Sequence, residues 1–314
     1  MKEIKQPEGW EMKDIFEKVA LNQYGYYQLR TINSEEERKR RFEESYFQEY
    51  AGSTYAKEYE EDELKYIRTQ LGGKAIVIEE NLKKTGFLPE KKYSPLDLGC
   101  GEGFLLKFFR ERGAVVKGID FGSYAVESHN PEVMDAFVQG DLEELLPIMA
   151  EKGEKYNVIN MDRVLDMVID PQSCLQKIKR LMDKDSILLI KVANNYSYLQ
   201  QMLLRSGELT KEYWLDDPDH TGYFNREGLI RLAEAQGYEC LDFYADTFVD
   251  LHLLNPLTNY YEKPETGKQS HKATVRLENL LFEISPERMV EIARSLSEMG
   301  FGREIIGVFR RKDL

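Results

Sequence analysis

The chain has 314 residues, of which 42% are hydrophobic and 32% are charged, and this supply of apolar side chains excludes global disorder. Its 43 Lys and Arg residues against 56 Asp and Glu residues give a formal net charge of −13. A surface of that sign repels phosphate backbones and argues against nucleic acid as a partner. No apolar run approaches the roughly 20 residues that span a bilayer, so we expect no membrane span.

The cysteines indicate the compartment. Cys100, Cys174 and Cys240 are far apart, odd in number, and lack the paired spacing of zinc ligands or redox motifs. The N-terminal residues carry no apolar core of the kind that a signal peptide needs. We therefore expect reduced thiols and a cytoplasmic location.

The first part of the chain, residues 1–72, is polar, rich in aromatic residues and predicted to be helical. Ser34 followed by Glu37 matches a capping box, and pairs of Glu with Lys or Arg four residues later extend it as a solvated helix face. The tyrosines of this part either pack helices onto the main domain or form an aromatic lid over a bound substrate. For any single tyrosine we prefer the packing role. These tyrosines are Tyr24, Tyr26, Tyr27, Tyr46, Tyr50, Tyr55 and Tyr59.

The second part alternates strand and helix patterns, and together with the third it forms the expected core, 73–249. Alternation of this kind predicts an α/β fold with a mostly parallel, Rossmann-like sheet and helices on both faces. The helix of 104–112 is ended by Gly113, and Asp170 with Pro171 begins another as N-cap and first helical residue. The predicted strands are 95–98, 114–120, 136–139, 156–161 and the strongly apolar 186–192.

The third part continues this pattern, and the last part departs from it. We predict helices over 196–204 and 226–236, a polar loop over 216–220 and a strand over 239–249. An insertion over 250–303 begins irregularly and ends in a helix that Ser285 and Pro286 cap and Gly300 terminates. Residues 304–314 contain a final strand, and the insertion is expected to cap the side of the pocket where a substrate binds.

A glycine loop follows the first core strand. Gly99, Gly101 and Gly103 surround Cys100 and Glu102, at the end of a strand and the start of a helix. Glycines there let the backbone pass close to a ligand in the crevice of an open α/β sheet. A dinucleotide fingerprint would have its third glycine at the position of Phe104, so the shorter spacing favours a ligand without pyrophosphate.

Acidic residues end the following strands and complete the predicted ligand site. Asp120 is placed to accept hydrogen bonds from ribose hydroxyls. Asp141 can reach an adenine amine, and Phe121 and Leu142 can sandwich the purine. The alternative is a glycine turn of another α/β protein whose acids only cap strand ends. Three further residues border the remaining end of the ligand. Asp97 can orient the loop or receive an ammonium group through water, and Met161 and Asp162 lie beside the expected methionine moiety.

In this order the motifs resemble those of class I S-adenosylmethionine-dependent methyltransferases. The resemblance rests on 97–103, on 118–120, on 140–142 and on 160–162, and it covers 73–249. It implies a seven-stranded sheet whose last strand, near 304–309, is antiparallel. It also implies S-adenosylmethionine as cofactor, S-adenosylhomocysteine as product and methyl transfer as the reaction.

The flanking segments resemble a narrower branch of the family. Residues 194–197 and 218–224 are similar to segments of ubiquinone-type O-methyltransferases, while 44–50 and 300–306 are similar to bacterial members that accompany surface-polysaccharide synthesis. The second likeness implies a small-molecule acceptor with a sugar-related hydroxyl or amine. Phenols and quinone precursors stay open as acceptors, and the sequence does not indicate the oligomeric state.

The chain has four histidines from which a general base could come. His220 follows the fifth strand and is the preferred candidate, with a structural role for its ring weighed equally. His129, His252 and His271 rank lower. Contiguous acids beside His220 superficially resemble a hard-metal cluster, but the proline among them works against convergence on one ion, and we predict no metal.

Two other functions remain open on the sequence alone. One is an NAD(P)-dependent oxidoreductase on the same architecture, against which Phe104 argues. The other is a non-catalytic module that binds S-adenosylmethionine, against which the complete set of glycines and acids argues. Binding experiments separate the first from methyl transfer, and turnover with an acceptor separates the second.

Overall fold

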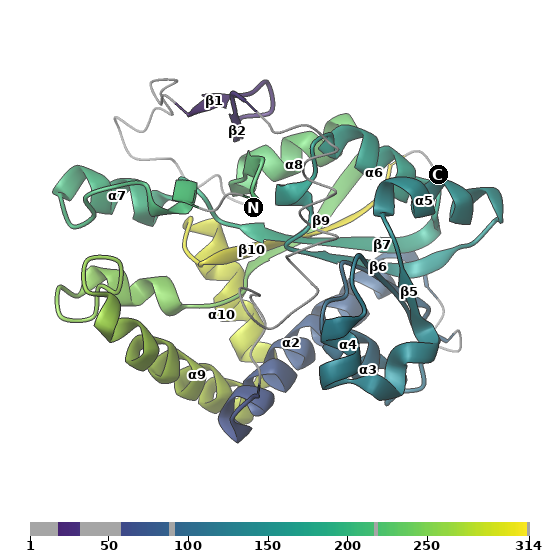
Figure 1. The fold of residues 1–314 in the computed structure, drawn as a ribbon, viewed down its shortest axis with the longest axis horizontal. Helices are drawn as coiled ribbons and strands as arrows, with labels where there is room; N and C mark the ends of the chain where they lie inside the picture. The colour runs from purple at the N-terminus through teal and green to yellow at the C-terminus, as the bar shows by residue number, and fades with distance from the viewer. Residues whose placement is uncertain (1–17, 32–57, 88–91, 217–218, 313–314) are drawn as a thin grey trace.

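The computed structural model describes residues 18–31, 58–87, 92–216 and 219–312. Its centre is a seven-stranded sheet in the order β5-β4-β3-β6-β7-β10-β9 (Figure 1). The predicted Rossmann-like sheet is confirmed, and β10 runs antiparallel to both of its neighbours. The strands are β3 (Pro95–Leu98), β4 (Lys117–Asp120), β5 (Phe137–Gln139), β6 (Tyr156–Asp162), β7 (Met182–Ala193), β9 (Tyr238–Ala245) and β10 (Glu304–Arg311).

Helices cover both faces of this sheet, as Figure 1 shows. Alternate residues along each strand point to opposite faces, so the sheet separates two hydrophobic clusters. One face packs against α5 (Leu142–Glu151), α6 (Pro171–Lys179) and α8 (Arg226–Ala235). The other packs against α2 (Glu61–Thr85), α3 (Phe104–Arg110), α4 (Tyr124–His129) and α10 (Pro286–Glu298).

The boundaries of the core differ from the sequence prediction at one point. Helix α2 has 25 residues and crosses the predicted boundary between 72 and 73, so part of the predicted first segment belongs to the core. Its residues Ile78 and Leu82 are buried against the sheet. Gly86 ends the helix at a φ of 83°, in the left-handed region.

Part of the N-terminal segment is β-structure, which corrects the prediction of an all-helical lid. Strands β1 (Val19–Leu21) and β2 (Tyr27–Leu29) pair antiparallel, and β2 pairs with β8 (Gly222–Tyr223). Tyr26 is buried and stacks on Phe224 at 4.2 Å, so this tyrosine packs the hairpin onto the core, as the preferred interpretation predicts. Ser34, Glu37, Tyr46, Tyr50 and Tyr55 lie outside the described residues.

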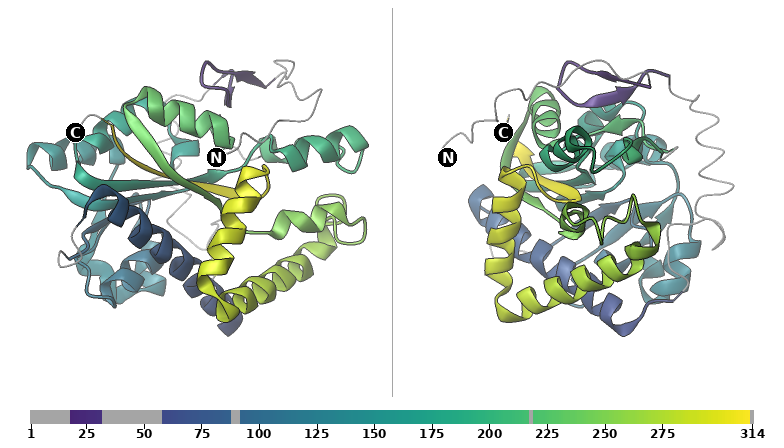
Figure 2. Two further views of the ribbon diagram at one scale, coloured as in Figure 1. Left: turned by 180° about the vertical axis from the view of Figure 1, so that it is seen from behind. Right: turned by 90° about the vertical axis from the view of Figure 1, so that its left-hand side faces the viewer.

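The insertion between β9 and β10 is more regular than predicted. After short 3-10 turns it contains α9 (Gly267–Ile284), an 18-residue helix that contacts both α2 and α10 (Figure 2). The irregular beginning is as predicted, but α9 was not predicted, because its first half is polar and no N-cap side-chain hydrogen bond marks its start. Helix α10 begins as predicted, with Ser285 accepting a hydrogen bond from the Arg288 amide.

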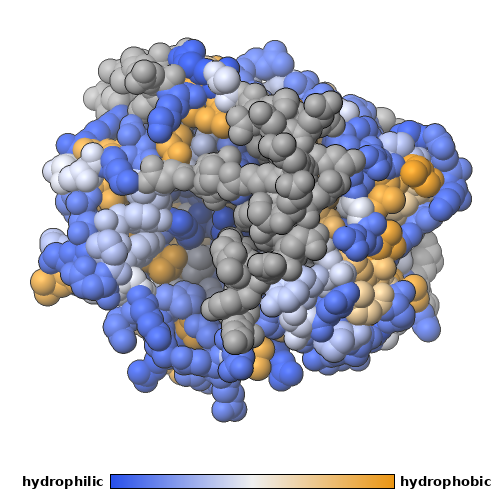
Figure 3. Space-filling model, in the orientation of Figure 1, coloured by the Kyte–Doolittle hydropathy of each residue, from blue (hydrophilic) through white to orange (hydrophobic). Residues whose placement is uncertain are grey.

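The remaining helix, α7 (Tyr198–Ser206), begins with a capping box between Ser197 and Gln200. It forms a third hydrophobic cluster with the hairpin and with Trp214. Among the described residues, no helix combines the length and the apolar character needed to cross a bilayer. The side chains on the face shown in Figure 3 are mostly hydrophilic, in keeping with the high charge content.

Candidate functional site

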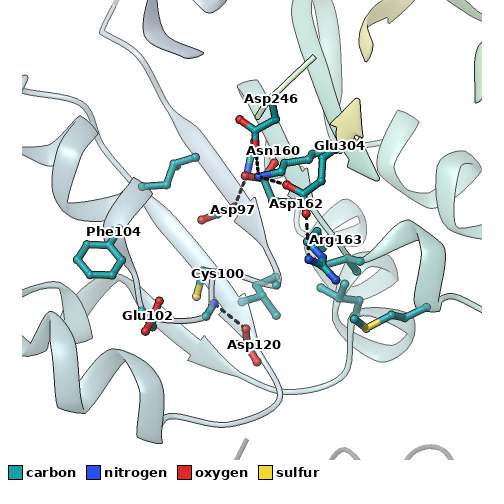
Figure 4. Close-up of a pocket in the computed structure, with 18 of the residues that line it drawn as sticks. Asp97, Cys100, Glu102, Phe104, Asp120, Asn160, Asp162, Arg163, Asp246 and Glu304 are labelled. Carbon is teal, nitrogen blue, oxygen red and sulfur yellow. Dashed lines mark hydrogen bonds and ion pairs between the residues drawn. The ribbon is translucent and has the colours of Figure 1, made fainter. Parts of the chain in front are cut away.

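A cavity of about 840 Å³ opens at the carboxyl ends of the parallel strands. One side is formed by the loops after β3, β4, β5 and β6, and the other by α2, α9 and the facing ends of β7, β9 and β10. Figure 4 shows Asp120 and Glu102 toward the first side, and Asp246, Glu304 and Arg163 toward the second. This is the crevice in which open α/β sheets bind ligands.

The glycine loop forms the floor of the first side. Gly99, Gly101 and Gly103 have φ values of 74°, 51° and 76°, a region that side chains rarely adopt. Gly99, Cys100 and Gly101 line the cavity. Gly103 does not line it: a Cβ there would lie 2.9 Å from Val126 Cγ2, so this glycine permits close packing of the loop against α4.

Asp120 ends β4 and faces the cavity beside the glycine loop. Its Oδ2 accepts a hydrogen bond of 2.7 Å from the Gly101 amide, which ties the loop to the strand end. Burial raises the pKa of Asp120 to about 6, although amide hydrogen bonds partly offset this effect. A partner that donates hydrogen bonds to the carboxylate would favour its charged form.

Asp141, Leu142 and Phe121, the residues predicted to surround an adenine, also line the cavity. Asp141 additionally caps α5, because its Oδ1 accepts a hydrogen bond of 2.8 Å from the Glu143 amide. Asp141 therefore caps a helix and lines the cavity at the same time.

A buried row of polar side chains connects the two sides of the cavity. Asp97 on β3 is directly beside Asn160 on β6, and Asn160 Nδ2 donates a hydrogen bond of 2.7 Å to Asp97 Oδ1. Lys74 from α2 donates to Asn160 Oδ1 at 2.9 Å and forms an ion pair of 2.5 Å with Asp162 Oδ2. Burial and the charge of Asp162 raise the pKa of Asp97 to about 7.

Met161 lies elsewhere than the predicted site. Its side chain belongs to the hydrophobic cluster on the opposite face and does not line the cavity. Strand alternation explains this placement, because Asn160 and Asp162 point to one face of β6 and Met161 points to the other. The alternation of polar and apolar residues in 160–162 indicates that Met161 faces away from its two polar neighbours, so the prediction for Met161 was wrong.

A second charged cluster on the cavity wall was missed by the sequence analysis. Lys191 on β7 pairs with Asp246, which follows β9, and with Glu304 Oε2 at 2.7 Å. Arg163 pairs with Glu304 Oε1 at 2.9 Å. Although burial opposes it, the charges of Lys191 and Arg163 lower the pKa of Glu304. The available signal was Lys191 itself, a lysine within an apolar strand.

His220 is buried outside the cavity lining. Its Nε2 lies 3.5 Å from Oδ2 of Asp166, a carboxylate that is also fully buried. The residue therefore lies in the interior beside Asp166, and the amide of the next residue, Thr221, donates a hydrogen bond to the Asp166 carbonyl. This placement favours the structural role over the role of general base, and the latter stays a prediction.

Of the other histidines, His271 lines the cavity, whereas His129 and His252 do not. His129 contacts Glu102 at 3.5 Å, and Tyr59 donates a hydrogen bond of 2.5 Å to the same carboxylate. His271 on α9 lines the opposite wall. Within the described ranges, no group of three or more His, Cys, Asp or Glu residues is placed to hold a metal ion.

This chain is similar to known methyltransferases. A family model described as "Methyltransferase domain" matches residues 74–242. The ubiquinone biosynthesis O-methyltransferase of Haemophilus ducreyi is 31% identical over 173 residues, which are 53% of this chain and 71% of that protein. The enzyme of the same name from Pasteurella multocida is 24% identical over 196 residues, 59% of this chain and 78% of that protein.

Solved structures show a more distant likeness. One is the plantazolicin methyltransferase BamL, solved in complex with a triazolic desmethylPZN analogue and SAH. It is 15% identical to this chain with a TM-score of 0.48, and the match covers 80% of this chain and 90% of BamL. A SAM-dependent methyltransferase from Archaeoglobus fulgidus is 16% identical, with a TM-score of 0.44 and coverage of 76% and 94%. Because the family model spans more than half of the chain and includes both the glycine loop and the strand-end acids, the chain belongs to the class I S-adenosylmethionine-dependent methyltransferases.

Proposed function

We propose that this protein transfers the methyl group of S-adenosylmethionine to a hydroxyl group of a polar small molecule of the sugar or sugar-nucleotide type. The observation that carries the proposal is the charged wall of the cavity opposite the glycine loop. Asp246, His271, Arg303 and Glu304 line that wall, and all four lie outside the matched segment 74–242. The relatives named O-methyltransferases support oxygen as the methylated atom.

The residues on the first side of the cavity fit S-adenosylmethionine. The left-handed glycines bring the backbone close to the cavity without side chains in the way. The buried carboxylates of Asp97 and Asp120 have raised pKa values, and each would gain a hydrogen-bonding partner from the ligand. A cofactor with ribose hydroxyls, a purine and an ammonium group supplies such partners.

Each group of residues has a separate task in this proposal. Asp120 holds the ribose hydroxyls, while Asp141, Leu142 and Phe121 surround the adenine. The bound cofactor supplies an electrophilic methyl group, so the protein acts chiefly by orienting the acceptor and excluding water.

The methionine end is assigned to the polar row. Asp97 and Asp162 are assigned to the ammonium group of the cofactor. Lys74 is assigned to neutralise the charge of Asp162 and to bind the carboxylate of the cofactor's methionine end. A phenolic acceptor is the second candidate, because the relatives are named for ubiquinone biosynthesis.

Calorimetry and turnover test the function. We expect S-adenosylmethionine and S-adenosylhomocysteine to bind with micromolar Kd and NAD⁺ to show no heat of binding. Release of S-adenosylhomocysteine should then depend on an acceptor from a panel of methyl glycosides and sugar nucleotides, with catechol as the phenolic comparison. Transfer to catechol alone would overturn the polar acceptor, and cofactor binding without transfer to any acceptor would favour a binding module.

Replacing Gly99 by alanine should weaken cofactor binding about 10-fold and lower Tm. A Cβ at Gly99 would lie 2.3 Å from Val164 Cγ2 and would face a φ of 74°, which costs about 1 kcal/mol or more by itself. Gly113→Ala is the matched control, because its φ is 82° and no heavy atom lies within 4 Å of the added Cβ. Equal losses in both variants, measured by thermal melting and calorimetry, would show that backbone strain alone is responsible.

The three cysteines carry free thiols. This state accords with a reducing compartment and supports the proposed cytoplasmic location.

A further inference from the structure

The charged cluster at the acceptor end of the cavity is built from three strands. Lys191 lies on β7, Asp246 directly follows β9, and Glu304 is the first residue of β10. Their side chains are 18%, 13% and 10% exposed, respectively, and all three line the cavity. The Asp246 amide also donates a hydrogen bond of 2.9 Å to the Glu304 carbonyl, which fixes the two carboxyl groups side by side.

The two carboxyl groups are not equivalent. Glu304 has both oxygens paired with cations, Oε1 with Arg163 and Oε2 with Lys191. Asp246 pairs with Lys191 through Oδ2. Glu304 is therefore committed to its ion pairs as a carboxylate, and Asp246 is the member of the pair that can take up a proton.

The surroundings of Asp246 raise its pKa on balance, which also favours uptake of a proton. Burial raises its pKa to about 6, Lys191 opposes this rise and Glu304 adds to it. The other titratable groups that face it are Glu278 from α9, Tyr66 from α2 and Tyr244 from β9. Burial raises the pKa of Glu278 to about 7, so this neighbour is about half ionised near that pH and becomes neutral as the pH falls below it.

The position of the cluster follows from the strand register. Asp162, assigned to the methionine end of the cofactor, is the direct neighbour of Lys191 across β6 and β7. Lys191 in turn contacts Asp246 and Glu304. Asp246 therefore lies one side chain beyond Asp162, on the cavity wall that the proposed function assigns to the acceptor, and Figure 4 shows it beside Glu304.

The geometry points to Asp246 as the general base that deprotonates the acceptor hydroxyl, with Lys191 and Glu304 as positioning residues. This inference rests on the proposed function. As the methyl group is transferred, the acceptor O–H bond breaks and its proton moves to the Asp246 carboxylate. The freed electron pair of oxygen forms the new bond to the methyl carbon. The pair from the broken carbon–sulfur bond stays on sulfur, which loses its positive charge.

Asp246→Asn tests the assignment. We expect kcat to fall at least 100-fold, as for loss of a general base, with KM within about threefold and the Kd for S-adenosylmethionine unchanged. The assay uses the member of the glycoside and sugar-nucleotide panel that the wild-type enzyme methylates best. Asp246→Glu keeps a carboxylate and should recover kcat to within about 10-fold of wild type, which separates proton transfer from structural support.

Asp242→Asn is the matched control. Asp242 lies on β9, is 9% exposed and pairs with Arg294 at 2.6 Å, but it does not line the cavity. Its variant loses a buried ion-paired acid from the strand that Asp246 directly follows, and it should keep wild-type kcat. An equal loss of kcat in the Asp242 and Asp246 variants would overturn the assignment, because it would mark a structural effect.

The dependence of kcat on pH gives an independent readout. The wild-type rate should fall as the pH drops below about 6, because the base is then protonated, and this limb should disappear in Asp246→Asn. Retention of the limb and of full kcat in Asp246→Asn, with loss of both in His220→Gln, would assign the base to His220 instead. Failure of the wild-type enzyme to methylate any panel member would overturn the proposed acceptor class together with this inference.

Discussion

Asp120→Ala is expected to weaken S-adenosylmethionine binding by at least 100-fold. Two ribose hydroxyls would lose a charged acceptor, at about 1.5 kcal/mol or more for each hydrogen bond, and about 1.4 kcal/mol corresponds to a tenfold change in Kd. The Gly101 amide would also lose its 2.7 Å hydrogen bond, which loosens the loop. Isothermal titration calorimetry with S-adenosylhomocysteine measures the effect without an acceptor.

Asp135→Ala is the control for the loss of an acid near this loop. Asp135 is exposed and pairs with Arg110 on the surface, so its variant should bind the cofactor like wild type. Because ribose hydroxyls stabilise the charged form of Asp120, the wild-type Kd should also rise as the pH falls below about 6. Unchanged binding in Asp120→Ala would refute the assignment of the ribose site.

Lys191→Met should lower the free energy of unfolding by about 3–5 kcal/mol at pH 7.5, the range for removal of one partner from a buried ion pair. Asp246 would be left buried without its cation, while Glu304 would keep Arg163. The loss should be smaller at pH 5.5. The pKa of Asp246 is already raised to about 6, so in acid the carboxyl group is neutral and needs no cation.

Urea denaturation at the two pH values measures this difference. Lys155→Met is the comparison, since Lys155 and its partner Asp183 are 41% and 58% exposed at 3.9 Å. An exposed pair of this kind contributes below about 1 kcal/mol. A loss for Lys191→Met that is as small as this, or that is the same at both pH values, would show that the cluster does not depend on the lysine.

Local patterns predicted most of the sheet. The apolar segments before Gly99 and around Leu188 become β3 and β7, and Asp170 caps its helix by accepting a hydrogen bond from the Ser173 amide. These features depend on neighbouring residues, so a single sequence contains them. The hairpin of β1 and β2 depends on pairing with β8, about 200 residues away, and no local pattern reports that contact.

The acids around the glycine loop were predictable for the same reason, and the charged wall opposite them was not. Asp97 lies near the end of β3, Asp120 ends β4 and Asp141 caps α5, each at a short distance in sequence from a recognisable strand or helix end. Lys191 and Asp246 meet only because β10 brings β7 and β9 together. Strand alternation could have placed Lys191 on the same face as Asp162, but it could not name its partner.

The place of β10 in the sheet has a consequence for how the protein is made. Among the described strands β10 is the last in sequence, yet it lies between β7 and β9 and is the one neighbour that β9 has in the sheet. During synthesis the strands from β3 to β7 can associate as they emerge, so the cofactor half can form early. β9 can pair in the sheet only after β10 has been made, and Glu304 is the first residue of β10. The cavity wall with Asp246 and Glu304 therefore forms last. Under the proposed function, a nascent chain would acquire its donor site before it acquires the means to choose what is methylated.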